Sequence, residues 1–157
     1  MRRRRTLKHL FREIKFRGKR LDNGEWVYGC LTRYSDAMSY ITVDLIEGEV
    51  YEVCSATVGQ FTGLQDKNDV EIYGGDVVKV RIKNEYFTAV VSYSKHRGCY
   101  VFGQKHPQIC YYSLDDIIED AKMRITSSYN IEGIGNIQDN PELLNEEVKV
   151  NDNDCPF

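Results

Sequence analysis

The stretch 57–78 constrains the fold more than any other part of the chain. Turn-forming and apolar residues alternate there most regularly, in the sequence TVGQFTGLQDKNDVEIYGGDVV. Gly59 and Gly63 bracket Phe61, and the short polar side chains of Asp66-Lys67-Asn68-Asp69 suit a tight turn because they can bond their own backbone. The stretch therefore predicts a chain reversal at this turn.

Beyond this turn the sequence alternates between apolar and basic residues with the period of a β-strand: Val78, Val80 and Ile82 against Lys79, Arg81 and Lys83. Gly75 permits positive φ and Asp76 can bond the next backbone N–H groups, so the pair predicts a corner before a half-buried strand that begins at Asp76. The alternative is a carboxylate site of Asp66, Glu71 and Asp76 for metal or acid–base chemistry. It needs a convergence that their spacing does not enforce.

The composition favours strands over helices, because eleven Tyr, six Phe and one Trp suit the pleated, half-buried surface of a sheet. A chain of 157 residues forms one large domain or two small ones. We expect a mainly β fold, either a small SH3-like barrel or a strongly curved antiparallel sheet, with one or two short C-terminal helices. Ser113 would cap the first helix, which runs to about Ala121, and Asn140-Pro141 would start the second, which ends near Glu147.

Alternation and turn residues locate the other strands. A hairpin is predicted around Asp22-Asn23-Gly24, with Trp26 beyond it as a core or interface anchor. Gly133 and Gly135 indicate a returning strand with a bulge or a close backbone approach. Further strands are predicted at 29–33, 40–45 and 49–54, and a three-stranded meander at 77–83, 87–93 and 99–102.

The net charge of −3 conceals a strong asymmetry. Residues 1–20 contain ten Lys and Arg against one Glu, whereas the rest of the chain contains eleven against twenty-three acidic residues. We expect residues 1–10 to form a disordered basic arm and residues 148–157 a frayed acidic tail. The arm either neutralises phosphates on nucleic acid or the chain's own acidic surface, or it is an extension without a role.

The sequence predicts no catalytic, metal or cofactor site. His9, His96 and His106 are too scattered for zinc, and no third group orients His96 and Cys99 as a nucleophile. No apolar run approaches the roughly 18 residues of a membrane span. The cysteines include no C-x-x-C pair and follow no secretory signal, so we expect reduced thiols in a cytoplasm: Cys30, Cys54, Cys99, Cys110 and Cys155.

Five motifs follow one another along the chain: REIKFRGK at 12–19, GEWVYG at 24–29, VGQFTGL at 58–64 with DKN at 66–68 and EIY at 71–73, IGNI at 134–137 and NPELL at 140–144. Together they resemble the YopX-like family of phage and prophage proteins over about Phe11 to Glu147. Asp69 stands where the family has Gly in the turn, and Gly74 where it has Glu. We expect one β-rich domain over 11–147, with sub-halves 11–56 and 57–147. The resemblance implies that it self-associates.

Three functions compete. The first is a non-enzymatic accessory module that assembles with copies of itself and binds a phage or host protein through an exposed strand edge or a tyrosine-rich face. The second is nucleic-acid binding, which the acidic remainder of the chain opposes. Its candidate contacts are Arg2, Arg3, Arg4 and Arg5 of the arm with Lys79, Arg81 and Lys83 of the basic strand. The third is a hydrolytic enzyme that uses clustered carboxylates.

Overall fold

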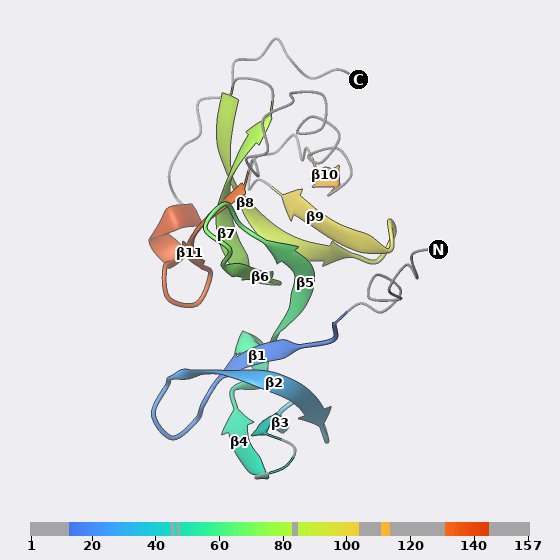
Figure 1. Cartoon of the computed structure of the whole chain (residues 1–157), viewed down its shortest axis with the longest axis vertical. Coiled ribbons are helices and arrows are strands. Elements are labelled where there is room, and N and C mark those ends of the chain that lie inside the picture. Colours follow the sequence, from blue (N-terminus) through green and yellow to red (C-terminus); the bar gives the residue numbers. More distant parts are fainter. Residues whose placement is uncertain are drawn as a thin grey trace, which may run out of the picture. The chain divides into compact units, whose positions relative to one another are not determined.

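The structure, a computed structural model, describes residues 13–44, 46, 48–82, 85–103, 111–113 and 131–144 (Figure 1). The chain divides into two compact units. The first extends to Gln65 and also includes Glu71–Gly74, and the second contains Asp66–Val70 and the chain from Gly75 onward. The chain therefore passes from one unit to the other three times, always within the stretch 57–78.

The first unit is an antiparallel sheet of six strands in the order β4-β3-β2-β1-β5-β6. The predicted hairpin is confirmed, because β1 pairs with β2 across a turn in which Gly24 has a φ of +74°. A short 3₁₀ turn, Ser55–Thr57, precedes β5. The strands are β1 (Phe16–Lys19), β2 (Trp26–Arg33), β3 (Ser39–Asp44), β4 (Glu49–Val53), β5 (Gly59–Gln65) and β6 (Glu71–Tyr73).

The far edge of this sheet curls back towards β1. The end of β4 returns to the residues that follow β1 through a bridge between Val53 and Arg20. Ile41 and Val53 are fully buried inside the curl. A Cβ atom at Gly18 would lie 3.0 Å from the Cβ of Val53, so the absence of a side chain lets β1 and β4 approach.

The second unit is an antiparallel sheet of five strands in the order β10-β9-β8-β7-β11. The predicted meander is confirmed as β7, β8 and β9. The returning strand is confirmed as β11, with a register shift between Gly133 and Gly135. The strands are β7 (Asp76–Ile82), β8 (Glu85–Ser94), β9 (Cys99–Gly103), β10 (Tyr111–Ser113) and β11 (Ile131–Asn136). The core of this unit contains Val77, Val78, Val80, Val91 and Phe102.

The mainly β prediction is thus confirmed, but its finer parts need correction. The described residues form two sheets and no closed barrel, so the SH3-like barrel is not confirmed. Asn140-Pro141 starts only a 3₁₀ turn, Pro141–Leu144. Ser113 ends strand β10, and the helix expected after it lies outside the described residues, as do the arm 1–10 and the tail 148–157.

Candidate interaction surface

A groove lies on the outer face of β2, β3 and β4 in the first unit. Cross-strand pairing explains its composition, since Thr32 is opposite Tyr40 and Thr42 is opposite Val50, which places their side chains on one face. The volume of the groove is about 510 Å³. Its lining residues are Thr32, Tyr34, Met38, Tyr40, Thr42 and Val50.

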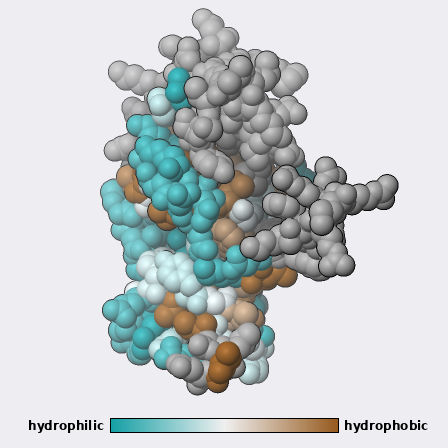
Figure 2. Space-filling model, viewed as in Figure 1, coloured by the Kyte–Doolittle hydropathy of each residue, from teal (hydrophilic) through white to brown (hydrophobic). Residues whose placement is uncertain are grey.

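Several apolar side chains of this face are open to solvent. Tyr34 is 73 % exposed, Val50 51 % and Met38 45 %. The loop that carries two of them is ordered by backbone hydrogen bonds, because Tyr34 N donates to Met38 O over 3.0 Å. Figure 2 shows hydrophobic residues on the surface of the first unit, where Figure 1 draws β2 to β4. A concave, exposed apolar surface of this kind is typical of a binding site.

The centre of the same sheet carries a second cluster, which is bonded internally. Lys15 Nζ lies 2.7 Å from Glu71 Oε2, and the hydroxyl of Tyr73 donates to the same carboxylate over 2.6 Å. The Arg17 guanidinium lies 4.6 Å from the ring centre of Trp26 and 5.0 Å from that of Tyr73. Trp26 is therefore half-buried beneath cationic side chains. Of the two predicted roles, it does not belong to the buried core, and the role of interface anchor stays a prediction.

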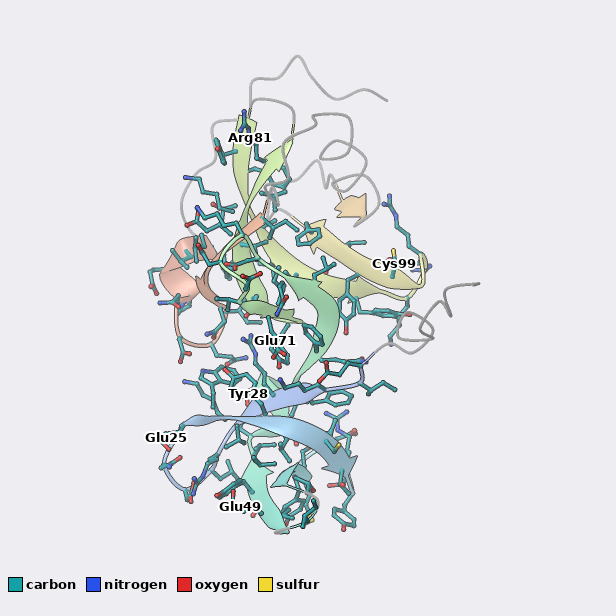
Figure 3. All side chains as sticks on the ribbon, viewed as in Figure 1. Glu25, Tyr28, Glu49, Glu71, Arg81 and Cys99 are labelled. Carbon is teal, nitrogen blue, oxygen red and sulfur yellow. The ribbon has the colours of Figure 1, made fainter. Side chains whose placement is uncertain are left out.

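Two pKa shifts follow from this cluster. Burial alone would raise the pKa of Glu71, but the hydrogen bonds from Lys15 and Tyr73 and the charge of Lys15 lower it below its ordinary value. Burial, and then the bond to Glu71, raise the pKa of Tyr73, so its hydroxyl remains a donor. Tyr28 lies at the rim, with its ring 5.5 Å from that of Tyr73 (Figure 3). The cluster stabilises the sheet.

The sequence could not identify this cluster, because its members are recognisable as a set only once the strands are paired. The register places Arg17 opposite Tyr28 and Lys19 opposite Trp26. The alternation of Lys15, Arg17 and Lys19 was the only available signal, and it equally fits a solvated strand.

The predicted nucleic-acid contacts are only partly described. Lys79 is exposed, and its Nζ lies 5.2 Å from the ring centre of Tyr86 on β8. The guanidinium of Arg81 lies 5.6 Å from the same ring, which is 57 % exposed. The structure therefore brings two basic residues together around one aromatic ring. Lys83 and Arg2 to Arg5 lie outside the described residues.

Asp66 has a structural role in the predicted turn. Asp66 is a buried residue. Its Oδ1 accepts hydrogen bonds from the backbone N–H of Asn68 over 2.7 Å and of Val70 over 3.1 Å, while Oδ2 accepts one from Gly133 N over 3.0 Å. Burial alone would raise its pKa, but these three donors hold the pKa below its ordinary value. Asp69 in the same turn has a φ of +62°.

The other residues singled out in the central stretch are also structural. Phe61 is buried and pairs with Tyr73 across β5 and β6. A Cβ atom at Gly59 would lie 2.3 Å from the carbonyl oxygen of Gly74, so only glycine fits there. Gly63 and Gly75 have φ values of +89° and +88°. The predicted corner is confirmed, because Gly75 is followed at once by β7, which begins with the buried Asp76.

The described residues contain no group of three His, Cys, Asp or Glu side chains that could hold a metal ion. Cys30, Cys54 and Cys99 are free thiols. No helix in the described part of the chain is long and apolar enough to cross a membrane.

Comparisons with known proteins give two findings. The model of the family described as "YopX protein" matches residues 15–145. Among solved structures, the chain is similar to protein EF1440 from Enterococcus faecalis, with 21 % identity over 84 % of this chain and 98 % of that chain and a TM-score of 0.46. No curated protein matches the chain.

Proposed function

Because this chain belongs to the YopX protein family, we propose that it is a non-enzymatic phage or prophage module that associates with copies of itself and binds a partner protein. The partner would be a phage or host protein in the bacterial cytoplasm. The contacts would be made by the groove face, defined here as the exposed face of β2, β3 and β4. No cofactor is needed for this role.

The exposed apolar lining of the groove carries this proposal. Tyr34, Met38 and Val50 together offer aromatic, thioether and branched aliphatic contacts beside the threonines of β2 and β3. Tyrosine supplies a large contact area at low cost in side-chain entropy, and methionine adapts to irregular surfaces. In addition, β4 is the last strand in the sheet order, so its first residues are available for pairing with another chain.

Light scattering tests self-association at micromolar concentration. We expect a mass that is a multiple of 18.2 kDa for the unchanged chain. The variant Met38→Lys with Val50→Lys should shift the mass towards the monomer, because a buried unpaired charge opposes the contact. Val70→Lys is the matched control, since Val70 is equally exposed but lies in the second unit. A single 18.2 kDa species for the unchanged chain would reject self-association.

The partner is tested separately by affinity capture from phage-infected cells. We expect a protein that the unchanged chain retains and the Met38→Lys, Val50→Lys variant loses. Equal retention by both proteins would place the partner contact elsewhere.

Nucleic-acid binding is the second candidate, and one observation favours it. Lys79 and Arg81 flank the exposed ring of Tyr86, an arrangement that suits a phosphate backbone beside a stacked base. Replacing both basic residues by alanine should weaken binding to single-stranded DNA and reduce its salt dependence. If DNA binding is undetectable at 50 mM salt, this candidate is rejected.

A further inference from the structure

The part of the chain that forms the groove is acidic. Residues 30–54 contain one cationic side chain, Arg33, against five acidic ones: Asp36, Asp44, Glu47, Glu49 and Glu52. Two of them form the acidic rim of the groove. Glu52 is the cross-strand partner of Tyr40, so its side chain lies on the groove face, and Asp36 lies in the exposed loop between the lining residues Tyr34 and Met38. An occupant that complements this surface is basic and carries apolar side chains for the lining.

The N-terminal segment of the chain has this chemistry. Residues 1–12, MRRRRTLKHLFR, contain six Lys and Arg and no acidic residue. Leu7, Leu10 and Phe11 supply apolar side chains beside these charges. A segment with this composition should bind best to a surface that is both acidic and apolar. Water leaves its apolar side chains exposed, and an uncharged groove leaves its arginines without an opposite charge.

The register of the first sheet directs this segment towards the groove. Phe16 is opposite Gly29 in an antiparallel pair, so the chain before β1 runs towards the end of β2 that carries Thr32 and Tyr34. The start of β1 and the arrowhead of β2 lie on the same side of the first unit in Figure 1. Neighbouring strands are about 4.8 Å apart, which places β3 about 10 Å from β1. Twelve extended residues span up to about 40 Å.

We propose that residues 2–11 dock in the groove of their own chain. The arginines lie along the acidic rim, and Leu7, Leu10 and Phe11 contact Tyr34, Met38 and Val50. A tethered segment is present at millimolar effective concentration, so it competes with any other occupant. This inference rests on the proposed function, because it assigns a regulator to the same groove and makes a second copy displace the segment before it binds.

A peptide of residues 1–12 with a fluorescent label tests this, by anisotropy with full-length proteins. The arm-reversed variant carries Arg2→Glu, Arg3→Glu, Arg4→Glu and Arg5→Glu. The peptide should bind it about tenfold more tightly than the unchanged chain, because the groove is no longer occupied. Adding the rim changes Asp36→Lys and Glu52→Lys should then weaken binding about tenfold or more.

Two controls separate docking from general attraction. Glu25→Lys and Glu142→Lys, added to the arm-reversed variant in place of the rim changes, should leave affinity within about twofold. Glu25 lies at the opposite end of β2 from the groove (Figure 3). Glu142 lies in the second unit. A peptide with Leu7→Ser, Leu10→Ser and Phe11→Ser should bind several-fold more weakly. Equal binding of this peptide would reduce the contact to charge alone and overturn the inference.

The change in peptide affinity and in scattering mass shows whether the groove is occupied by the segment of its own chain or by that of a second copy. Equal affinity for the unchanged and arm-reversed chains would show that the chain's own segment leaves the groove open, and would overturn the inference. A lower mass of the arm-reversed variant in light scattering would overturn it too, because the segment would then occupy a second copy. Self-association that needs Met38 and Val50 but shows no such competition rejects only this inference and leaves the proposed function standing.

Discussion

The central stretch 57–78 and the groove face contain similar residue types but use them differently. In the central stretch, the carboxylate of Asp66 meets three backbone donors, and that of Glu71 meets Lys15 and Tyr73. On the groove face, Tyr34 remains 73 % exposed. Tyrosines and acids therefore stabilise the fold where strand pairing brings donors to them, and they remain available for binding where it does not.

The largest effect should come from Tyr73, which is 1 % exposed. Replacing it by Ala should lower the free energy of unfolding by about 3–5 kcal/mol, because it leaves a large cavity against Phe61 and removes the donor to Glu71. Denaturant unfolding followed by circular dichroism measures this. Tyr73→Phe keeps the ring and should cost about 1–2 kcal/mol. A loss below about 1 kcal/mol for Tyr73→Ala would contradict the comparison, because truncating a side chain of the central stretch would then cost no more than truncating an exposed side chain of the groove face.

Asp66 should give the next effect, with a defined pH dependence. Asp66→Asn should lower the free energy of unfolding by about 2–3 kcal/mol at pH 7. The Asn side chain has one accepting oxygen where the carboxylate has two, because its NH2 group can only donate, so it cannot accept all three backbone hydrogen bonds. The folded-state pKa of Asp66 is lowered, so its contribution is complete above the unfolded pKa of about 3.9 and is lost as the pH falls from there through the lower folded pKa. The difference between the unfolding midpoints of the two proteins should therefore stay constant from pH 7 to about pH 5 and shrink only below about pH 4. A difference that shrinks well above this pH would contradict the assigned bonds.

Asp69→Gly should give a smaller effect of the opposite sign. Asp69 has a φ of +62°, which glycine adopts without strain, so the substitution should stabilise the chain by about 0.5–1 kcal/mol. Thermal unfolding measures this shift. Lys95→Gly, in an exposed turn of the second unit, is a control that should not stabilise. Destabilisation by Asp69→Gly would show that the Asp side chain contributes more than its backbone conformation costs.

The smallest effect on stability should come from the groove face. Tyr34→Ala should change the free energy of unfolding by less than about 0.5 kcal/mol, because an exposed side chain loses little on truncation. The same substitution should measurably reduce the scattering mass of the associated form. A stability loss as large as that of Tyr73→Ala would show that the groove face is part of the core.

The sequence predicted those features that depend on neighbouring residues. The turn at Asp66, the corner at Gly75 and the bulge at β11 were all visible because glycine and short polar side chains act on their own backbone. The meander β7 to β9 followed from its alternation of side chains.

Features that depend on distant residues were missed or left open. The sequence could not decide between core and interface for Trp26, because its burial depends on Arg17 and Lys19, which lie over its ring only once β1 and β2 pair. The helix expected after Asn140 ended as a 3₁₀ turn at Leu144. The groove was not predicted, because its lining comes from β2, β3, β4 and a loop, and only the expectation of a tyrosine-rich face pointed towards it.

The threefold passage of the chain between the two units limits how this protein can be divided. Strand β6 returns to the first unit after the turn 66–70 has joined the second, so no continuous fragment contains one unit complete without residues of the other. A protease cut or a truncation at any peptide bond between residues 66 and 74 therefore divides both units. No single cut anywhere in the chain releases the two units complete and apart.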